Sequence, residues 1–213
     1  IGTLYSIYLA DNTNSLLYKR KALSSTKKLY GIKSKEYCDV AISLIADMRF
    51  LNRFDEAQAL CDSTISSIKT NPELKKYLSW LYNQRGLIAS ELHYTRKAIE
   101  NFNKAVETAD DINDAISFLL NRDSFWGELG FDATSNFLYI DSLINTNPDV
   151  SDKTRFTFYN KAAIYFADSD KELANRYYNL ADYYSKDLSP HRKVLLRLSQ
   201  SLSEPNQAKR YSL

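Results

Sequence analysis

Few side chains in this sequence could carry out catalytic chemistry. His93 and His191 could act as general bases or metal ligands, but neither has a partner residue at a spacing typical of a catalytic triad or a metal site. The chain has only 5 glycines and no glycine-rich phosphate loop. We therefore expect no catalytic residue, no metal ligand and no cofactor, in a protein that is not an enzyme.

The acidic segment from Asp168 to Glu172 alternates carboxylates in a way that could suggest calcium binding. It lacks the turn glycine and the later glutamate of a calcium loop. The segment also falls where two predicted helices must turn, so we expect it to cap a helix.

Cys38 and Cys61 fall on the two helices of one predicted hairpin, at positions where small apolar side chains would pack. We expect two reduced core thiols instead of a disulfide, and no basic residue that would activate them. Cysteine usage therefore leaves the cellular compartment open.

The elements that would position a binding site follow from an internal repeat. The turn Thr70-Asn71-Pro72-Glu73 recurs 76 residues later as Thr146-Asn147-Pro148-Asp149. At that offset small residues align with small ones and aromatic residues with aromatic ones. Alanines recur through both halves of each unit, at Ala22, Ala57, Ala98, Ala133, Ala174 and Ala208. Such spacing is typical of a solenoid of stacked helical hairpins.

The four prolines divide the chain in the same way, because proline fits the first turn of a helix and is unfavourable in its interior. Asn71, Asn147 and Ser189 are the predicted N-caps, and Pro205 opens the last helix. Gly31 is a predicted helix C-cap. Apolar residues recur at helical spacing, and no stretch alternates for long enough to predict a strand.

Two segments resemble the tetratricopeptide (TPR) repeat. Residues 79–112 match its small and aromatic positions through Tyr82, Gly86, Ala89, Ala98, Phe102 and Ala105. Residues 155–188 match through Phe158, Ala162, Tyr165, Ala174, Tyr178 and Ala181. Both depart from the pattern at its leucine, which is Arg85 or Lys161. The resemblance implies an all-α, right-handed superhelix of about six hairpins, as one domain over residues 1–213.

In the TPR family the first helix of each hairpin lines a concave groove that holds a peptide. The resemblance therefore implies a set of partner-binding residues: Trp80, Asn83, Leu87, Phe118, Arg122, Phe156, Tyr159 and Asn160. The alternative for the aromatic members is packing against the neighbouring hairpin. Trp126 can be read in two helix registers, one of which buries it. The lysines of the family's carboxylate-binding clamp do not accompany Asn83 and Asn160.

The resemblance implies a scaffold or sensor that binds a protein or peptide, of the kind found in bacterial signalling proteins and transcriptional regulators. The alternative is a small-molecule or glycan receptor built on the same helices, which the 16 tyrosines do not exclude. With Lys+Arg 28 against Asp+Glu 26, we expect no nucleic-acid partner. No apolar run is long enough to cross a membrane, so we expect a soluble chain in an undetermined compartment.

The sequence starts at Ile1 and stops partway through a predicted helix, which suggests a piece of a longer protein. The predicted last helix, from Pro205, is too short to cover the apolar residues before it. We therefore expect this end to fray, or to be covered by a further segment or by a second copy of the chain.

Overall fold

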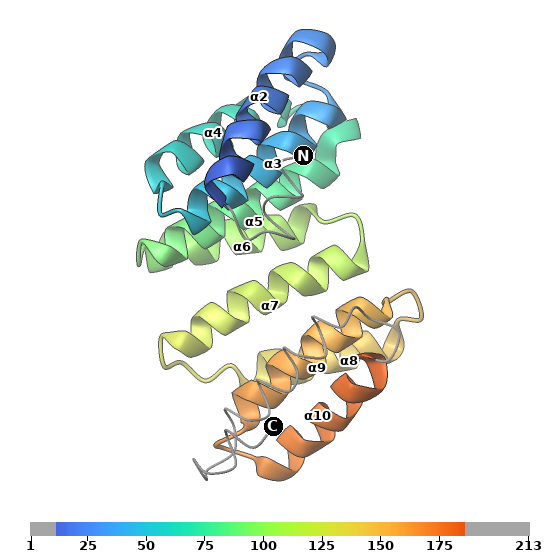
Figure 1. The fold of residues 1–213 in the computed structure, drawn as a ribbon. Coiled ribbons are helices and arrows are strands. Elements are labelled where there is room, and N and C mark those ends of the chain that lie inside the picture. Colours follow the sequence, from blue (N-terminus) through green and yellow to red (C-terminus); the bar gives the residue numbers. More distant parts are fainter. Residues whose placement is uncertain (1–11, 186–213) are drawn as a thin grey trace. The chain divides into compact units, whose positions relative to one another are not determined.

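The computed structural model describes residues 12–185, and every regular element in that range is a helix (Figure 1). The all-α prediction is confirmed. The elements are α2 (Asn12–Tyr30), α3 (Lys35–Phe50), α4 (Phe54–Ile68), the 3-10 helix η1 (Pro72–Leu74), α5 (Lys75–Glu91), α6 (Thr95–Thr108), α7 (Ile112–Glu128), α8 (Thr134–Thr146), α9 (Asp152–Phe166) and α10 (Lys171–Ser185). The predictions for Ser189, Pro190, His191, Pro205 and Ala208 lie outside the described residues.

Contacts divide the chain into two compact units, Ile1–Asp111 and Ile112–Leu213, where the sequence predicts one continuous domain. In the first unit each helix from α2 to α6 packs against the next, and α3 also contacts α5. In the second, α9 packs against α10, and α7 contacts α8 and α9. Packing between consecutive helices is the arrangement expected of helical hairpins. The right-handed superhelix remains a prediction.

The hairpin of α5 and α6 is built as its sequence pattern predicts. Ala98, Phe102 and Ala105 on α6 are completely buried, and the ring of Phe102 lies against Gly86 of α5. The matching hairpin of α9 and α10 buries Ala162, Ala174, Tyr178 and Ala181. Small residues bring the two helices together, and the aromatic ring fills the space that remains.

Three hairpin turns share one backbone geometry. Asn52, His93 and Gly130 adopt left-handed conformations, with φ of 56°, 57° and 82°. In each turn the next residue's amide donates to a carbonyl five residues earlier: Arg53 to Met48 (2.8 Å), Tyr94 to Ala89 (2.8 Å) and Phe131 to Trp126 (3.3 Å). This is the Schellman closure of a helix C-terminus. The position of His93 is thus explained by the turn, because histidine tolerates positive φ better than most residues.

Of the predicted asparagine and glycine caps, two are confirmed and one is wrong. The Asn71 side chain accepts a hydrogen bond from the Glu73 amide at 3.1 Å, and Gly31 follows α2 with φ of 80°. The prediction for Asn147 is wrong, because α9 begins four residues after Pro148, at Asp152, with Ser151 as its N-cap.

Arg155 explains why Pro148 does not start α9. Its guanidinium donates to the carbonyls of Ile144, Asn147 and Val150, at 3.0, 3.2 and 3.1 Å. Those carbonyls belong to the end of α8 and to the connection after it, and Val150 itself is buried. The connection is therefore stabilised as a loop, and the two Asn-Pro turns differ in structure despite their similar sequences.

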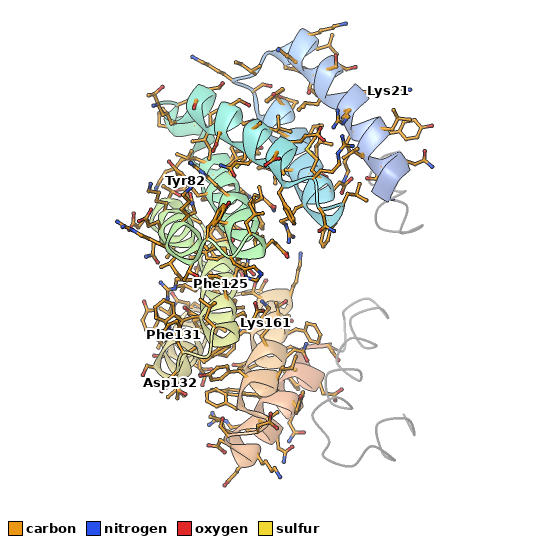
Figure 2. All side chains as sticks on the ribbon, turned by 90° about the vertical axis from the view of Figure 1, so that its left-hand side faces the viewer. Lys21, Tyr82, Phe125, Phe131, Asp132 and Lys161 are labelled. Carbon is orange, nitrogen blue, oxygen red and sulfur yellow. The ribbon has the colours of Figure 1, made fainter. Side chains whose placement is uncertain are left out.

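The hairpin of α7 and α8 also departs from the repeat. Ala133 precedes α8 as its N-cap, and Phe137 takes the buried fourth position that alanine occupies in α4, α6 and α10. Phe137 stacks on Tyr165 with ring centroids 4.5 Å apart. Phe125 is the buried aromatic of α7, and Trp126 is half-buried against Phe131 in the turn that Figure 2 marks. The structure therefore selects the register that leaves Trp126 outside the core.

Candidate functional site

The groups that could support catalysis are used structurally where the structure describes them. The Asp170 carboxylate accepts a hydrogen bond from the Leu173 amide at 3.0 Å, so the predicted capping role is confirmed. Within residues 12–185, no group of three or more His, Cys, Asp or Glu side chains is placed to hold a metal ion. Cys38 and Cys61 are buried free thiols, as predicted.

A serine, a lysine and an aspartate meet between α2 and α3, a combination that the sequence analysis missed. The Ser15 hydroxyl donates to Oδ2 of Asp47, and Nζ of Lys19 lies 2.8 Å from Oδ1. These residues are 0%, 7% and 2% exposed. A substrate could not reach them without unfolding α2, so we interpret the cluster as a buried ion pair that joins two helices. The signal in the sequence was the single carboxylate within the apolar stretch of α3.

The structure corrects half of the predicted partner-binding set. Asn83, Phe118, Phe156 and Tyr159 are buried, so the expectation that they line an open groove is wrong. Packing of aromatic side chains between helices removes apolar surface from water, which is the main source of stability in a stack of helices. The alternative of packing within the core is the one observed.

Tyr159 shows this clearly. Its ring stacks on Tyr177 and Tyr184, with centroids 5.9 and 5.8 Å away, and meets Phe158 edge to face at 5.2 Å. Its hydroxyl donates to Asn145 at 3.4 Å. The residue belongs to an aromatic cluster shared by α9 and α10.

A carboxylate completes the polar edge of that cluster. Asp141 accepts hydrogen bonds from the Tyr177 hydroxyl at 3.3 Å and from Asn145 at 3.2 Å. Burial raises the pKa of Asp141 above its usual range, and burial together with Asp141 raises the pKa of Tyr177. The tyrosines and amide that a small-ligand receptor would use therefore contact one another.

Trp80, Leu87, Arg122 and Asn160 remain partly exposed. Arg122 donates from Nε to the adjacent Asp123 at 2.7 Å. Trp80 and Leu87 are seven residues apart on one side of α5, and Glu91 continues that side at the end of the helix.

We define the α3–α5 face as this side of α5 together with the neighbouring side of α3. Its members are Ile42, Arg49 and Phe50 from α3, with Trp80, Leu87 and Glu91 from α5. Nη1 of Arg49 lies 3.1 Å from Oε1 of Glu91, and its guanidinium stacks 4.7 Å from the centre of the Phe50 ring. Phe50 is 65% exposed. Phe50 and Glu91 are exposed and the other members are partly exposed. The predicted set did not include Ile42, Arg49, Phe50 or Glu91.

The missing members could have been found from the repeat. Phe50 and Glu91 are 41 residues apart, which is the spacing of Ala57 and Ala98 and of the turn residues Asn52 and His93. Extending the predicted side of α5 to the end of that helix would have included Glu91, and the 41-residue spacing would then have pointed to Phe50 on α3.

No protein-family model matches the chain, and a search of curated proteins finds no match either. The described fold is that of an all-α protein made of helical hairpins. Of the helices described, none has the length and apolarity needed to cross a membrane.

Proposed function

We propose that this chain is a TPR-type interaction domain that binds a protein or peptide segment on the α3–α5 face. The observation that carries the proposal is the exposed ring of Phe50 beside Arg49, whose ion pair with Glu91 joins it to the side of α5 that carries Trp80 and Leu87. Aromatic and arginine side chains on one surface are the residues most often found at binding hot spots. The repeated hairpin turns and the small-aromatic packing support the TPR assignment.

The test begins with a displayed pool of random dodecapeptides selected against the unmodified protein. Affinities of the enriched peptides are then measured for Phe50→Ala and Trp80→Ala. Each substitution should weaken binding by about 2 kcal/mol or more if its ring is a hot spot. Tyr94→Ala is the control, since Tyr94 is an exposed aromatic residue in the turn before α6 and is not a member of the face.

Equal affinity for the unmodified protein, Phe50→Ala and Trp80→Ala would place the binding surface elsewhere. Failure to enrich any peptide would count against a peptide-binding function. Circular dichroism and thermal unfolding of each variant separate loss of binding from loss of folding.

The alternative receptor for a small molecule or glycan would use the aromatic cluster around Tyr159. That cluster fills its own space, because its rings stack on each other and its polar atoms are hydrogen-bonded internally. We therefore favour the surface of the first unit. A role as scaffold or sensor in a bacterial signalling or regulatory protein is an analogy at the level of fold.

A further inference from the structure

The guanidinium of Arg49 has few hydrogen-bond acceptors around it. Its ion-pair partner is Glu91, through Nη1, and its Nε is buried without a hydrogen-bond acceptor. The side chain is 13% exposed, and its guanidinium lies over the Phe50 ring. A guanidinium offers five donors in a planar fork, and a carboxylate can take two of them at once. The contact with Glu91 leaves most of this capacity unused.

Glu91 is poorly placed to keep Arg49. It is the last residue of α5, where the helix dipole disfavours negative charge. Its side chain is 50% exposed, so the hydration of the carboxylate changes little when it leaves the arginine. The carboxylate side of this ion pair is therefore open to solvent, although the guanidinium is largely buried. A second carboxylate could therefore replace it.

We propose that the α3–α5 face recognises an acidic side chain next to an apolar one. The aspartate or glutamate of the partner takes the place of Glu91 on Arg49, and the neighbouring apolar side chain covers Phe50. The occupant is thus an acidic-apolar peptide segment, chosen by charge complementarity with Arg49. This inference rests on the proposed function and specifies its ligand.

The probe is a pair of peptide pools that differ at one position. One pool is built of dodecapeptides with a central Leu-Glu and random flanks, and the other has Leu-Gln in the same place. The unmodified protein should bind the glutamate pool more tightly. Glu91→Gln should tighten that binding by about two- to fivefold, because it removes the competing carboxylate. Arg49→Gln should weaken it about tenfold or more and abolish the preference.

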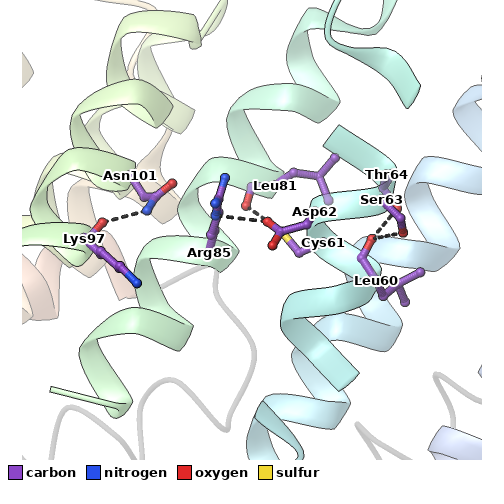
Figure 3. Close-up of polar contacts among 9 residues, drawn as sticks. All are labelled: Leu60, Cys61, Asp62, Ser63, Thr64, Leu81, Arg85, Lys97 and Asn101. Carbon is purple, nitrogen blue, oxygen red and sulfur yellow. Dashed lines mark hydrogen bonds and ion pairs between the residues drawn. The ribbon is translucent and has the colours of Figure 1, made fainter. Parts of the chain in front are cut away.

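The chain offers a matched control ion pair. Arg85 lies on α5, as Glu91 does, and its Nε is 3.1 Å from Oδ1 of Asp62 on α4 (Figure 3). Neither residue belongs to the α3–α5 face. Asp62→Asn and Arg85→Gln remove charges of the same type and should leave both pools unaffected. Arg49→Lys keeps the positive charge but loses the planar guanidinium, so it is expected to lose part of the preference for the glutamate pool.

Equal binding of the two pools by the unmodified protein would overturn the inference, as would unchanged or weaker glutamate binding by Glu91→Gln. Glu91→Gln is at the surface, so this result does not depend on whether Arg49→Gln folds. If both pools bind equally and Phe50→Ala still weakens them, the acidic preference is wrong and the proposed function stands. If neither pool binds and no random peptide does, the proposed function itself fails.

Discussion

Gly86 of α5 lies directly against the ring of Phe102 on α6. A Cβ atom built on Gly86 would be 2.6 Å from Cδ1 and 2.7 Å from Cε1 of that ring. Because Phe102 is completely buried, the ring has no open space into which it can move. The close approach of the two helices therefore depends on the missing side chain.

We expect Gly86→Ala to destabilise the protein by about 1 to 3 kcal/mol through overpacking. Helix propensity acts in the opposite direction, since alanine favours a helix by about 1 kcal/mol over glycine. A net loss in urea unfolding would therefore report the contact with Phe102. Gly127→Ala is the control, because its Cβ would lie 3.3 Å from Tyr165 and a smaller effect is expected. A more stable Gly86→Ala would contradict the packing described.

Tyr159→Ala should cost about 3 to 5 kcal/mol of unfolding free energy, because it leaves a cavity in the cluster with Tyr177 and Tyr184. Tyr159→Phe should cost under about 1.5 kcal/mol, since it keeps the ring and removes the hydroxyl that donates to Asn145 at 3.4 Å. Thermal and urea unfolding measure both. If Tyr159→Ala unfolds like the unmodified protein, the ring belongs to a surface and the original groove assignment is restored.

Because Lys19 and Asp47 form a buried pair, removing one partner should destabilise the protein more than replacing both. Asp47→Ala should destabilise the protein by about 3 to 5 kcal/mol, because the ammonium group is left buried with the Ser43 carbonyl at 3.4 Å. Replacing both, as Lys19→Met with Asp47→Leu, should recover most of that loss. Unfolding free energies of Lys19→Met, Asp47→Leu and the double variant give the coupling. Additive losses in unfolding free energy would show that the two side chains do not interact, which would contradict the buried ion pair.

Burial predicts that both thiols are unreactive in the folded protein. It raises the pKa of Cys38 to about 11 and of Cys61 to about 12. The thiolate is the reactive form, and at pH 8 it is scarcely populated at either position. The Cys61 thiol also donates to the Leu81 carbonyl at 3.2 Å (Figure 3).

We expect labelling by an aromatic disulfide reagent at pH 8 to be slow in buffer and fast in denaturant, with two thiols titrated. The rate in buffer should then follow the rate of local or global opening. Rapid labelling of the folded protein would indicate that the core around α3 and α4 is open.

The sequence alone determined the helices and the interior of the main hairpin. Helical spacing of apolar residues predicted an all-α chain, and the small-aromatic-small pattern predicted that Gly86, Ala98, Phe102 and Ala105 would meet. Such patterns are local: they depend on which residues share one side of a helix and on how large they are. Gly31 and Asn71 were predictable for the same reason, since caps are set by nearest neighbours in the chain.

The tertiary structure decided which side chains are buried and which are exposed. Trp80 and Phe156 are 76 residues apart and occupy equivalent positions of the repeat, yet Phe156 is buried and Trp80 stays partly exposed. Asn147 is not the N-cap of α9, because Arg155 stabilises the connection as a loop through contacts that span up to eleven residues and cannot be deduced from a turn motif. Arg49 and Glu91 are 42 residues apart and meet only because α3 packs against α5. Burial and pairing depend on which helices become neighbours, and that is a property of the packed chain.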